Sequence, residues 1–332
     1  MKVCLFGCKS TSELLARHIH ETLSLDTVVT ISAEKGEKAQ VADFKDIAPW
    51  CSENGVRLRY AHRYDQKSDE DLEFFRQEKF DIGFVNGWQR LVPDNILSSF
   101  QIGVFGMHGS AANLPIGRGR SPMNWSLIEG RKLFYTNMFK YKAGIDDGDV
   151  IDTIAFAIND QDTAETLHYK NTLSMVAMIK RNAARFTAAA LQYRKQDDNL
   201  TPTYYPKRTP DDSLIDWTSP IDNIERFIRA VAPPFNGAFT FHGDTHISIL
   251  RAAIFELDNS PLGFDAASWG EIVEVFGNGK FLVKAPGGLL IVHDYLAEGF
   301  TPRPGITLSN GTHLLKQFPR NSHGGHDLPE GD

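Results

Sequence analysis

The chain is 332 residues long, and 42% of its residues are hydrophobic and 23% are charged. This length and balance are typical of globular proteins and favour two domains over one. A net charge of -7 argues against a nucleic-acid partner, because phosphate binding usually leaves a basic surface. Three cysteines without zinc spacing, no apolar run of membrane-spanning length and no signal-like start predict a cytoplasmic protein without a membrane partner or a metal site.

The first two hundred or so residues alternate short apolar runs with amphipathic segments. Helices are expected to begin near Ser10 and near Ser68, where capping residues precede apolar periodicity. Alternation of this kind indicates an α/β fold with a Rossmann-like, doubly wound and mostly parallel sheet. Strands rich in Val, Ile and Phe are predicted at 3–7, 27–32, 57–61, 81–86 and 103–107.

His108 directly follows the last of these strands. Ligands of a parallel sheet bind beyond the carboxyl ends of its strands, so a functional side chain is expected here. A loop rich in Gly, Pro and Arg comes next, and the acidic segment 144–149 lies further along the chain. A histidine and a carboxylate placed in this way can share a proton. Taken alone, the acidic segment fits an Asx turn equally well, and it lacks the glutamate spacing of a calcium loop.

The later part of the chain changes in character. A strand at 150–158 and a long helix reaching Gln192 are expected, followed by a polar, proline-bearing linker at 195–210. A helix near 221–230 and five short apolar runs then predict a small antiparallel barrel or sandwich of the oligonucleotide-binding (OB) type. The expected units are a catalytic domain at 1–205, a C-terminal helix plus OB-like β-barrel domain at 206–320 and a flexible tail at 321–332.

Several spaced motifs together resemble the folate-dependent formyltransferase family, which includes methionyl-tRNA formyltransferase and, closest to this sequence, the sugar N-formyltransferases. The family pattern is Asn-x-His-x-Ser, a Leu-Pro pair, Arg-Gly and, later, Leu-Asp-x-Gly-Asp. The resemblance runs over nearly the whole chain and includes the segments 213–217 and 228–230. The pattern is filled here by His108, Ser110, Leu114-Pro115, Arg118-Gly119 and Asp146-Asp147-Gly148-Asp149.

The resemblance implies transfer of a formyl group from 10-formyltetrahydrofolate, the co-substrate, to an amine. It implies that His108 is the acid/base and oxyanion donor and that Asp146 is its partner and proton relay. Trp88 fits a folate contact and a packed loop anchor equally well. The expected folate-binding residues are Trp88, Gln89, Arg90, Leu114, Pro115 and Asp146, and the expected substrate-binding residues are Ser110, Arg118 and Arg120.

Two departures from the family pattern concern the oxyanion site. The asparagine expected two residues before the histidine is Gly106 here, and the loop between Ser110 and Leu114 is about two residues longer than usual. Loss of an essential oxyanion donor lowers a rate by about 10²–10³-fold. We therefore predict that Asn113, or a backbone N–H of the longer loop, is the catalytic replacement.

Three functions fit these features. Formylation of a nucleotide-linked amino sugar for a surface polysaccharide is favoured, because the segments 87–90 and 118–125 look closer to the sugar enzymes. Methionyl-tRNA formyltransferase fits the chain length, but from Lys207 onward ten Lys/Arg face sixteen Asp/Glu, which gives -6 rather than the basic face that tRNA needs. A catalytically silent folate- or nucleotide-binding homologue is suggested by Gly106. The resemblance also implies a homodimer.

Overall fold

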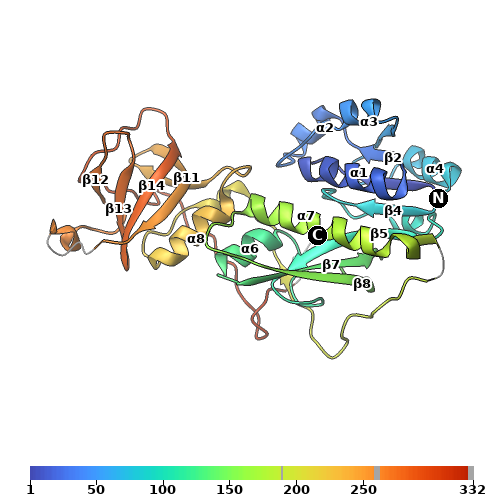
Figure 1. The fold of residues 1–332 in the computed structure, drawn as a ribbon. Helices are drawn as coiled ribbons and strands as arrows, with labels where there is room; N and C mark the ends of the chain where they lie inside the picture. The colour runs from blue at the N-terminus through green and yellow to red at the C-terminus, as the bar shows by residue number, and fades with distance from the viewer. Residues whose placement is uncertain (188–189, 258–261, 328–332) are drawn as a thin grey trace.

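The computed structural model describes residues 1–187, 190–257 and 262–327, and it consists of two units (Figure 1). The first unit is built on a seven-stranded sheet of order β3-β2-β1-β4-β5-β7-β8. The strands from β3 to β5 in this order are parallel, whereas β7 and β8 are antiparallel to their neighbours. The strands are β1 (Val3–Phe6), β2 (Leu25–Thr30), β3 (Arg57–Tyr60), β4 (Ile82–Val85), β5 (Gly103–Ser110), β7 (Leu133–Lys140) and β8 (Val150–Ala157).

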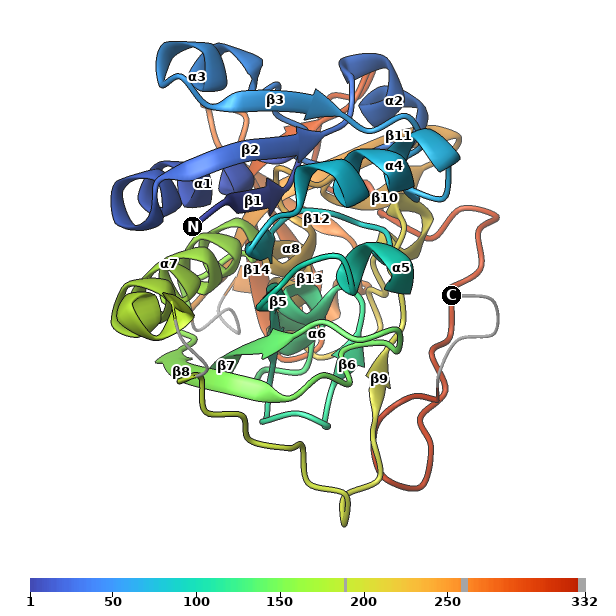
Figure 2. The same ribbon diagram turned by 90° about the vertical axis from the view of Figure 1, so that its right-hand side faces the viewer.

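Helices cover both faces of this sheet. Figure 2 shows α1 and α7 on one side and α4 and α5 on the other. On the first side, Leu15 and Met175 pack against sheet residues such as Phe84, and on the second an aromatic cluster surrounds Phe6 and Phe75. The mostly parallel α/β fold is therefore confirmed. The helices are α1 (Ser10–Leu23), α2 (Ala33–Lys38), α3 (Ala48–Glu53), α4 (Asp69–Glu78), α5 (Asp94–Leu97), α6 (Pro122–Ile128) and α7 (Ala164–Asn182).

Two elements differ from the sequence prediction. The strand β5 continues to Ser110 instead of ending at Met107, because β7 pairs with it in antiparallel register and places Asn137 opposite His108. His108 therefore lies inside a strand rather than after one. The long helix α7 ends at Asn182, and a 3-10 turn follows it.

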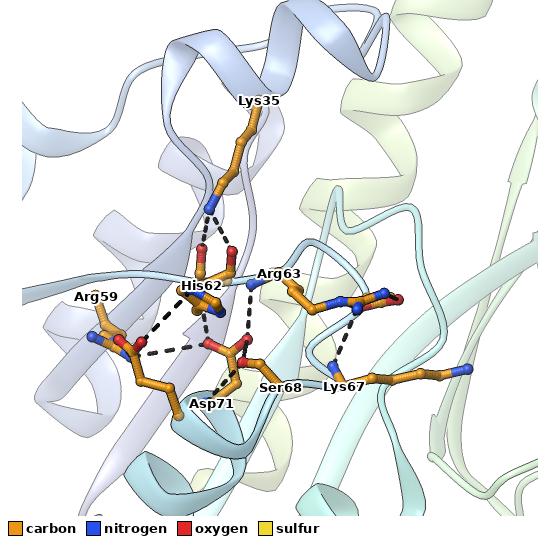
Figure 3. A network of polar contacts seen from close by, with 10 residues as sticks. Lys35, Arg59, His62, Arg63, Lys67, Ser68 and Asp71 are labelled. Atoms are coloured by element: carbon orange, nitrogen blue, oxygen red, sulfur yellow. Dashed lines mark hydrogen bonds and ion pairs between the residues drawn. The ribbon is translucent and has the colours of Figure 1, made fainter.

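A buried carboxylate fixes the connection between β3 and α4 (Figure 3). Asp71 accepts hydrogen bonds from the backbone N–H groups of His62 and Arg63, at 2.7 and 2.9 Å, and from the Ser68 hydroxyl at 2.7 Å. Hydrogen bonds from backbone N–H groups stabilise such a carboxylate. The network holds in place the turn that carries Tyr64, which contacts the loop after β4.

The second unit is a five-stranded antiparallel sheet of order β10-β11-β14-β13-β12, preceded by α8 (Ile221–Val231). The apolar side of α8, including Ile224 and Ile228, packs into the core of this sheet. Residues 305–309 hydrogen-bond both to Phe241 of β10 and to Ile272 of β12, so they link the two edge strands. The OB type of this domain stays a prediction. The strands are β10 (Ala238–His242), β11 (Thr245–Phe255), β12 (Ile272–Val275), β13 (Phe281–Ala285) and β14 (Gly288–Leu296).

The segment expected to be a linker runs along the first unit before it reaches the second. Its short strand β9 (Tyr204–Tyr205) pairs in parallel with β6 (Arg118–Gly119). On its other side, Tyr204 forms a bridge with His326, a residue of the segment expected to be a tail. Residues 328–332 of that segment lie outside the described residues. In the described part of the chain, every helix is too short or too polar to cross a membrane.

Candidate active site

His108 is buried on β5 and holds an acceptor at each ring nitrogen. Its Nδ1 lies 3.1 Å from Oδ2 of Asp146, and its Nε2 lies 2.7 Å from the carbonyl oxygen of Gly117. A neutral imidazole has one N–H and can donate to only one of these acceptors, whereas the protonated ring donates to both. The structure thus brings together the two residues that the sequence pairs.

Asp146 occupies a turn with a positive φ of 49°. Its Oδ2 also accepts the backbone N–H of Gly119 at 2.9 Å, so this oxygen joins the acidic turn to the loop after His108. Gly148 is required for the turn, because a Cβ there would lie 1.7 Å from the carbonyl oxygen of Lys140. The Asp-x-Gly spacing therefore has a steric reason: the glycine lets the turn approach β7 closely enough to direct the carboxylate at the histidine.

Gln196 is a site residue that the sequence reasoning missed. Its Nε2 donates to the carbonyl oxygens of Asp146 and Gly148, at 2.7 and 2.9 Å. Its Oε1 accepts from Nη2 and Nε of Arg118, at 2.6 and 3.2 Å. One buried amide therefore joins the acidic turn to the predicted substrate-binding arginine. The sequence does not distinguish Gln196 from its neighbours, because it is a single amide in a polar, proline-bearing stretch.

The loop between β5 and β6 is held by its own polar contacts. The Ser110 hydroxyl donates to the carbonyl oxygen of Ile116 at 2.8 Å, and the Gly117 N–H donates to the Thr203 hydroxyl at 2.9 Å. Leu114 and Pro115 are buried, and Leu114 packs with Phe139 and Val150. These contacts fix the Gly117 carbonyl that faces His108.

Two further predicted residues, Asn113 and Arg120, make backbone hydrogen bonds. The Asn113 side chain is exposed, and its backbone carbonyl accepts the Ile116 N–H. Arg120 follows β6, and its backbone N–H donates to Tyr205. Both remain predictions: Asn113 as the replacement donor and Arg120 as a substrate contact.

The loop after β4 lies at the same edge of the sheet as the loop after β5, since the two strands are parallel neighbours. Trp88 is buried between Phe6 and Tyr64, with ring centroids 6.2 and 4.9 Å away. The backbone N–H of Gln89 donates to the Tyr64 hydroxyl at 3.2 Å, and the Arg90 guanidinium stacks over the Tyr64 ring. The Trp88 side chain is thus a packed anchor, and groups of this loop other than that side chain remain available to a ligand.

The sheet with its parallel core, the appended antiparallel domain and the paired histidine and carboxylate together define a two-domain α/β protein with a candidate acid–base site. The described residues contain no group of three or more His, Cys, Asp or Glu side chains that could hold a metal ion. The formyl transferase family model matches residues 1–177, and that of the formyl transferase C-terminal domain matches residues 207–311. The chain therefore belongs to the formyl transferase family, as its motifs indicate, and is an enzyme of that class.

Individual relatives are more distant. The bifunctional polymyxin resistance protein ArnA of Wigglesworthia glossinidia brevipalpis is 30% identical over 191 residues, which cover 57% of this chain but only 29% of that protein. An N-formyltransferase from Helicobacter canadensis, solved with folinic acid and dTDP-3-aminofucose, has a TM-score of 0.62 at 16% identity and covers 89% of this chain and 100% of its own. The methionyl-tRNA formyltransferase of Clostridium thermocellum has a TM-score of 0.56 at 18% identity, over 77% and 94% of the two chains. At 16% and 18% identity, the likeness to these two solved structures shows a shared fold.

Proposed function

We propose that this enzyme transfers the formyl group of 10-formyltetrahydrofolate to the primary amine of a nucleotide-linked amino sugar. The observation that carries the proposal is the buried His108–Asp146 contact of 3.1 Å beside the loops that follow β4 and β5. Support also comes from the Helicobacter canadensis relative, which was solved with folinic acid and a dTDP-linked amino sugar. A surface-polysaccharide role and a cytoplasmic location follow from such a substrate.

The reaction needs two bond changes at the formyl carbon and a proton transfer between the two nitrogens. The amine lone pair attacks the formyl carbon and forms the new C–N bond, while the C=O electron pair moves onto oxygen. Collapse of this tetrahedral species re-forms C=O and breaks the bond to N10 of the folate, which takes a proton as it leaves. The net result is one formamide and one tetrahydrofolate, and the proton lost by the amine equals the proton gained by N10.

His108 and Asp146 suit the proton transfer. The Asp146 side chain is 18% exposed and that of His108 only 7%, so the carboxylate is the member of the pair that a substrate can reach. We assign Asp146 as the proton relay to the reacting nitrogens and His108 as the acid/base behind it. General acid–base catalysis of this kind contributes about 10²–10⁴-fold.

The ligand contacts follow from the same arrangement. Trp88, Gln89 and Arg90 form the loop after β4, and we assign this loop to the folate, with Leu114, Pro115 and Asp146 opposite it. The backbone N–H of Gln89 donates to Tyr64 and its carbonyl oxygen accepts from the Arg90 guanidinium, so we assign Gln89 through its side chain and Arg90 through its backbone groups. Ser110, Arg118 and Arg120 are assigned to the sugar nucleotide, because guanidinium groups suit phosphate oxygens. Arg118 would use the N–H groups that Gln196 does not engage.

The experiment is a formyl-transfer assay. The purified chain is incubated with 10-formyltetrahydrofolate and a panel of dTDP- and UDP-linked amino sugars, and tetrahydrofolate release and the formylated sugar are measured together. Equal amounts of both products are expected with at least one sugar. Folate binding without product from any amine would contradict the proposal and favour a catalytically silent homologue.

A tRNA substrate is the second candidate, since the Clostridium thermocellum relative is a methionyl-tRNA formyltransferase. The C-terminal charge of -6, from ten Lys/Arg and sixteen Asp/Glu, is unfavourable for phosphate binding. Retention of charged initiator tRNA at low salt, lost steeply as salt rises, would favour this candidate. We expect no retention. The homodimer is tested separately, by sedimentation of the free enzyme.

A further inference from the structure

A tyrosine fills the place of the missing asparagine. Gly106 and His108 are two residues apart on β5, so their Cβ directions point to the same face of the sheet. A Cβ built on Gly106 would lie 2.2 Å from Cε1 of Tyr141 and 2.6 Å from its hydroxyl oxygen. The tip of the Tyr141 ring therefore occupies the volume that a side chain at position 106 would enter, on the side of the sheet that carries His108.

Tyr141 is held firmly in this position. Its backbone N–H donates to the carbonyl oxygen of Val104 at 2.8 Å, and its ring stacks on Phe139 with centroids 5.2 Å apart. Leu114 of the long loop packs in the same small cluster. Burial, and secondarily the nearby Asp146 carboxylate, raise the pKa of Tyr141 well above its usual value, so its hydroxyl stays a hydrogen-bond donor throughout the neutral range.

The hydroxyl group of Tyr141 is also free to donate. No hydrogen bond between this hydroxyl and another of the described residues is found, and only burial and the charge of Asp146 account for its raised pKa. A phenol held rigidly by packing and left without a protein acceptor is a preorganised donor, the kind of group that stabilises developing charge most effectively.

We propose that the Tyr141 hydroxyl is the oxyanion donor of this enzyme, in the role that the resemblance assigns to an asparagine amide. This inference rests on the proposed formyl transfer. As the amine attacks, charge develops on the formyl oxygen, and the Tyr141 O–H strengthens its hydrogen bond to that oxygen and relaxes when C=O re-forms. The tyrosine keeps its proton throughout, so the proton balance of the reaction is unchanged.

Two asparagines are the competing donors. Asn137 lies opposite His108 and is fully buried; its Oδ1 accepts the Thr153 hydroxyl at 2.9 Å, and its Nδ2 has no partner among the described residues. However, Gly106 pairs with Phe139 rather than with Asn137, so Asn137 lies two residues away along β7 from the partner of Gly106. Asn113 is exposed at the loop. The three atoms nearest to a Cβ at position 106 all belong to Tyr141.

The test compares Tyr141→Phe with the unmodified enzyme, using Tyr193→Phe as a matched control on a half-exposed tyrosine. We expect kcat to fall by about 10²–10³-fold in Tyr141→Phe, with folate affinity changed less than about threefold since the ring packing is kept. Isotope-edited infrared spectra of ¹³C-formyl-labelled folate, bound without amine, should show the formyl C=O stretch move to higher frequency in Tyr141→Phe only. Tyr193→Phe should match the unmodified enzyme in every readout.

A rescue variant keeps the result interpretable. Gly106→Asn alone should lose activity, because its side chain collides with Tyr141, whereas Gly106→Asn combined with Tyr141→Ala should recover activity above Tyr141→Ala alone. Full turnover and an unchanged C=O stretch in Tyr141→Phe would overturn the proposal. If Asn137→Ser or Asn113→Ala lost turnover instead, that asparagine would be the oxyanion donor. No product from the unmodified enzyme would overturn the proposed function itself, which is a different result.

Discussion

The two units of the chain bury polar groups very differently. In the first unit, His108, Asn137 and Gln196 are all buried: Asn137 pairs opposite His108, and Gln196 binds the turn of Asp146, the partner of His108. In the C-terminal sheet the core is apolar, and the buried hydroxyl of Thr240 is satisfied by Trp217 at 2.9 Å and by the Ser309 carbonyl. Burying polar groups costs free energy unless they are paired. Several buried polar side chains close to one another are therefore a sign of a functional site rather than of a structural core.

The sharpest contrast is expected from matched histidine variants in the two units. His108→Asn should lower kcat by about 10²–10⁴-fold, because the acid/base is lost. His293→Asn, on β14, should leave kcat within about twofold and serves as the control. Single-turnover formyl transfer measures both. Equal effects of the two substitutions would remove the distinction between the units.

The opposite pattern is expected when the packing of the C-terminal unit is disturbed: stability should fall, and turnover should not. Ile228 is fully buried in the C-terminal core, so Ile228→Ala should reduce the free energy of unfolding of its unit by about 2–5 kcal/mol. Turnover per folded molecule should stay the same, since the reacting residues are in the other unit. Denaturant titration followed by fluorescence, together with activity on the folded fraction, checks this. A proportional loss of kcat would show that the C-terminal core takes part in the chemistry.

A smaller effect is expected at Gln196. Its amide positions both the Asp146 turn and Arg118, so Gln196→Ala should lower kcat by about tenfold and raise KM for the sugar nucleotide. Gln196→Glu keeps the acceptor for Arg118 but removes the donor to the two carbonyls. It should therefore recover KM better than kcat. If Gln196→Glu recovered kcat but not KM, the two roles assigned to this amide would be contradicted.

The smallest effect concerns the contact between the units. His168 of α7 lies 6.3 Å from the Phe235 ring, and burial, followed by the charge of Lys9, lowers its pKa to about 3. Because the folded pKa lies below the unfolded value, its stabilisation is present above about pH 6.5 and is lost as pH falls toward 3. Between pH 7 and 6 the loss should be less than about 1 kcal/mol. His168→Gln should show a smaller loss over that interval in denaturant titrations.

The sequence predicts local structure well, and it predicts contacts between residues distant in sequence less well. Strand positions follow from apolar runs, and the His108–Asp146 contact follows from spaced motifs. Gln196 and Tyr141 were not predicted, because each acts through a neighbour distant in sequence: Arg118 for the first and Gly106 for the second. Gly106 signalled that a donor was missing, but only the antiparallel pairing of β5 with β7 brings Tyr141 beside it.

Single-turnover formyl transfer is the measurement that tests the central claim most directly. The enzyme, in excess over 10-formyltetrahydrofolate, is mixed with a dTDP-linked amino sugar, and tetrahydrofolate and formamide are followed together, with Asp146→Asn as the comparison. We predict equal amounts of the two products from the unmodified enzyme and a rate lower by at least about 10²-fold for Asp146→Asn. Equal rates for the two proteins would contradict catalysis by the His108–Asp146 pair.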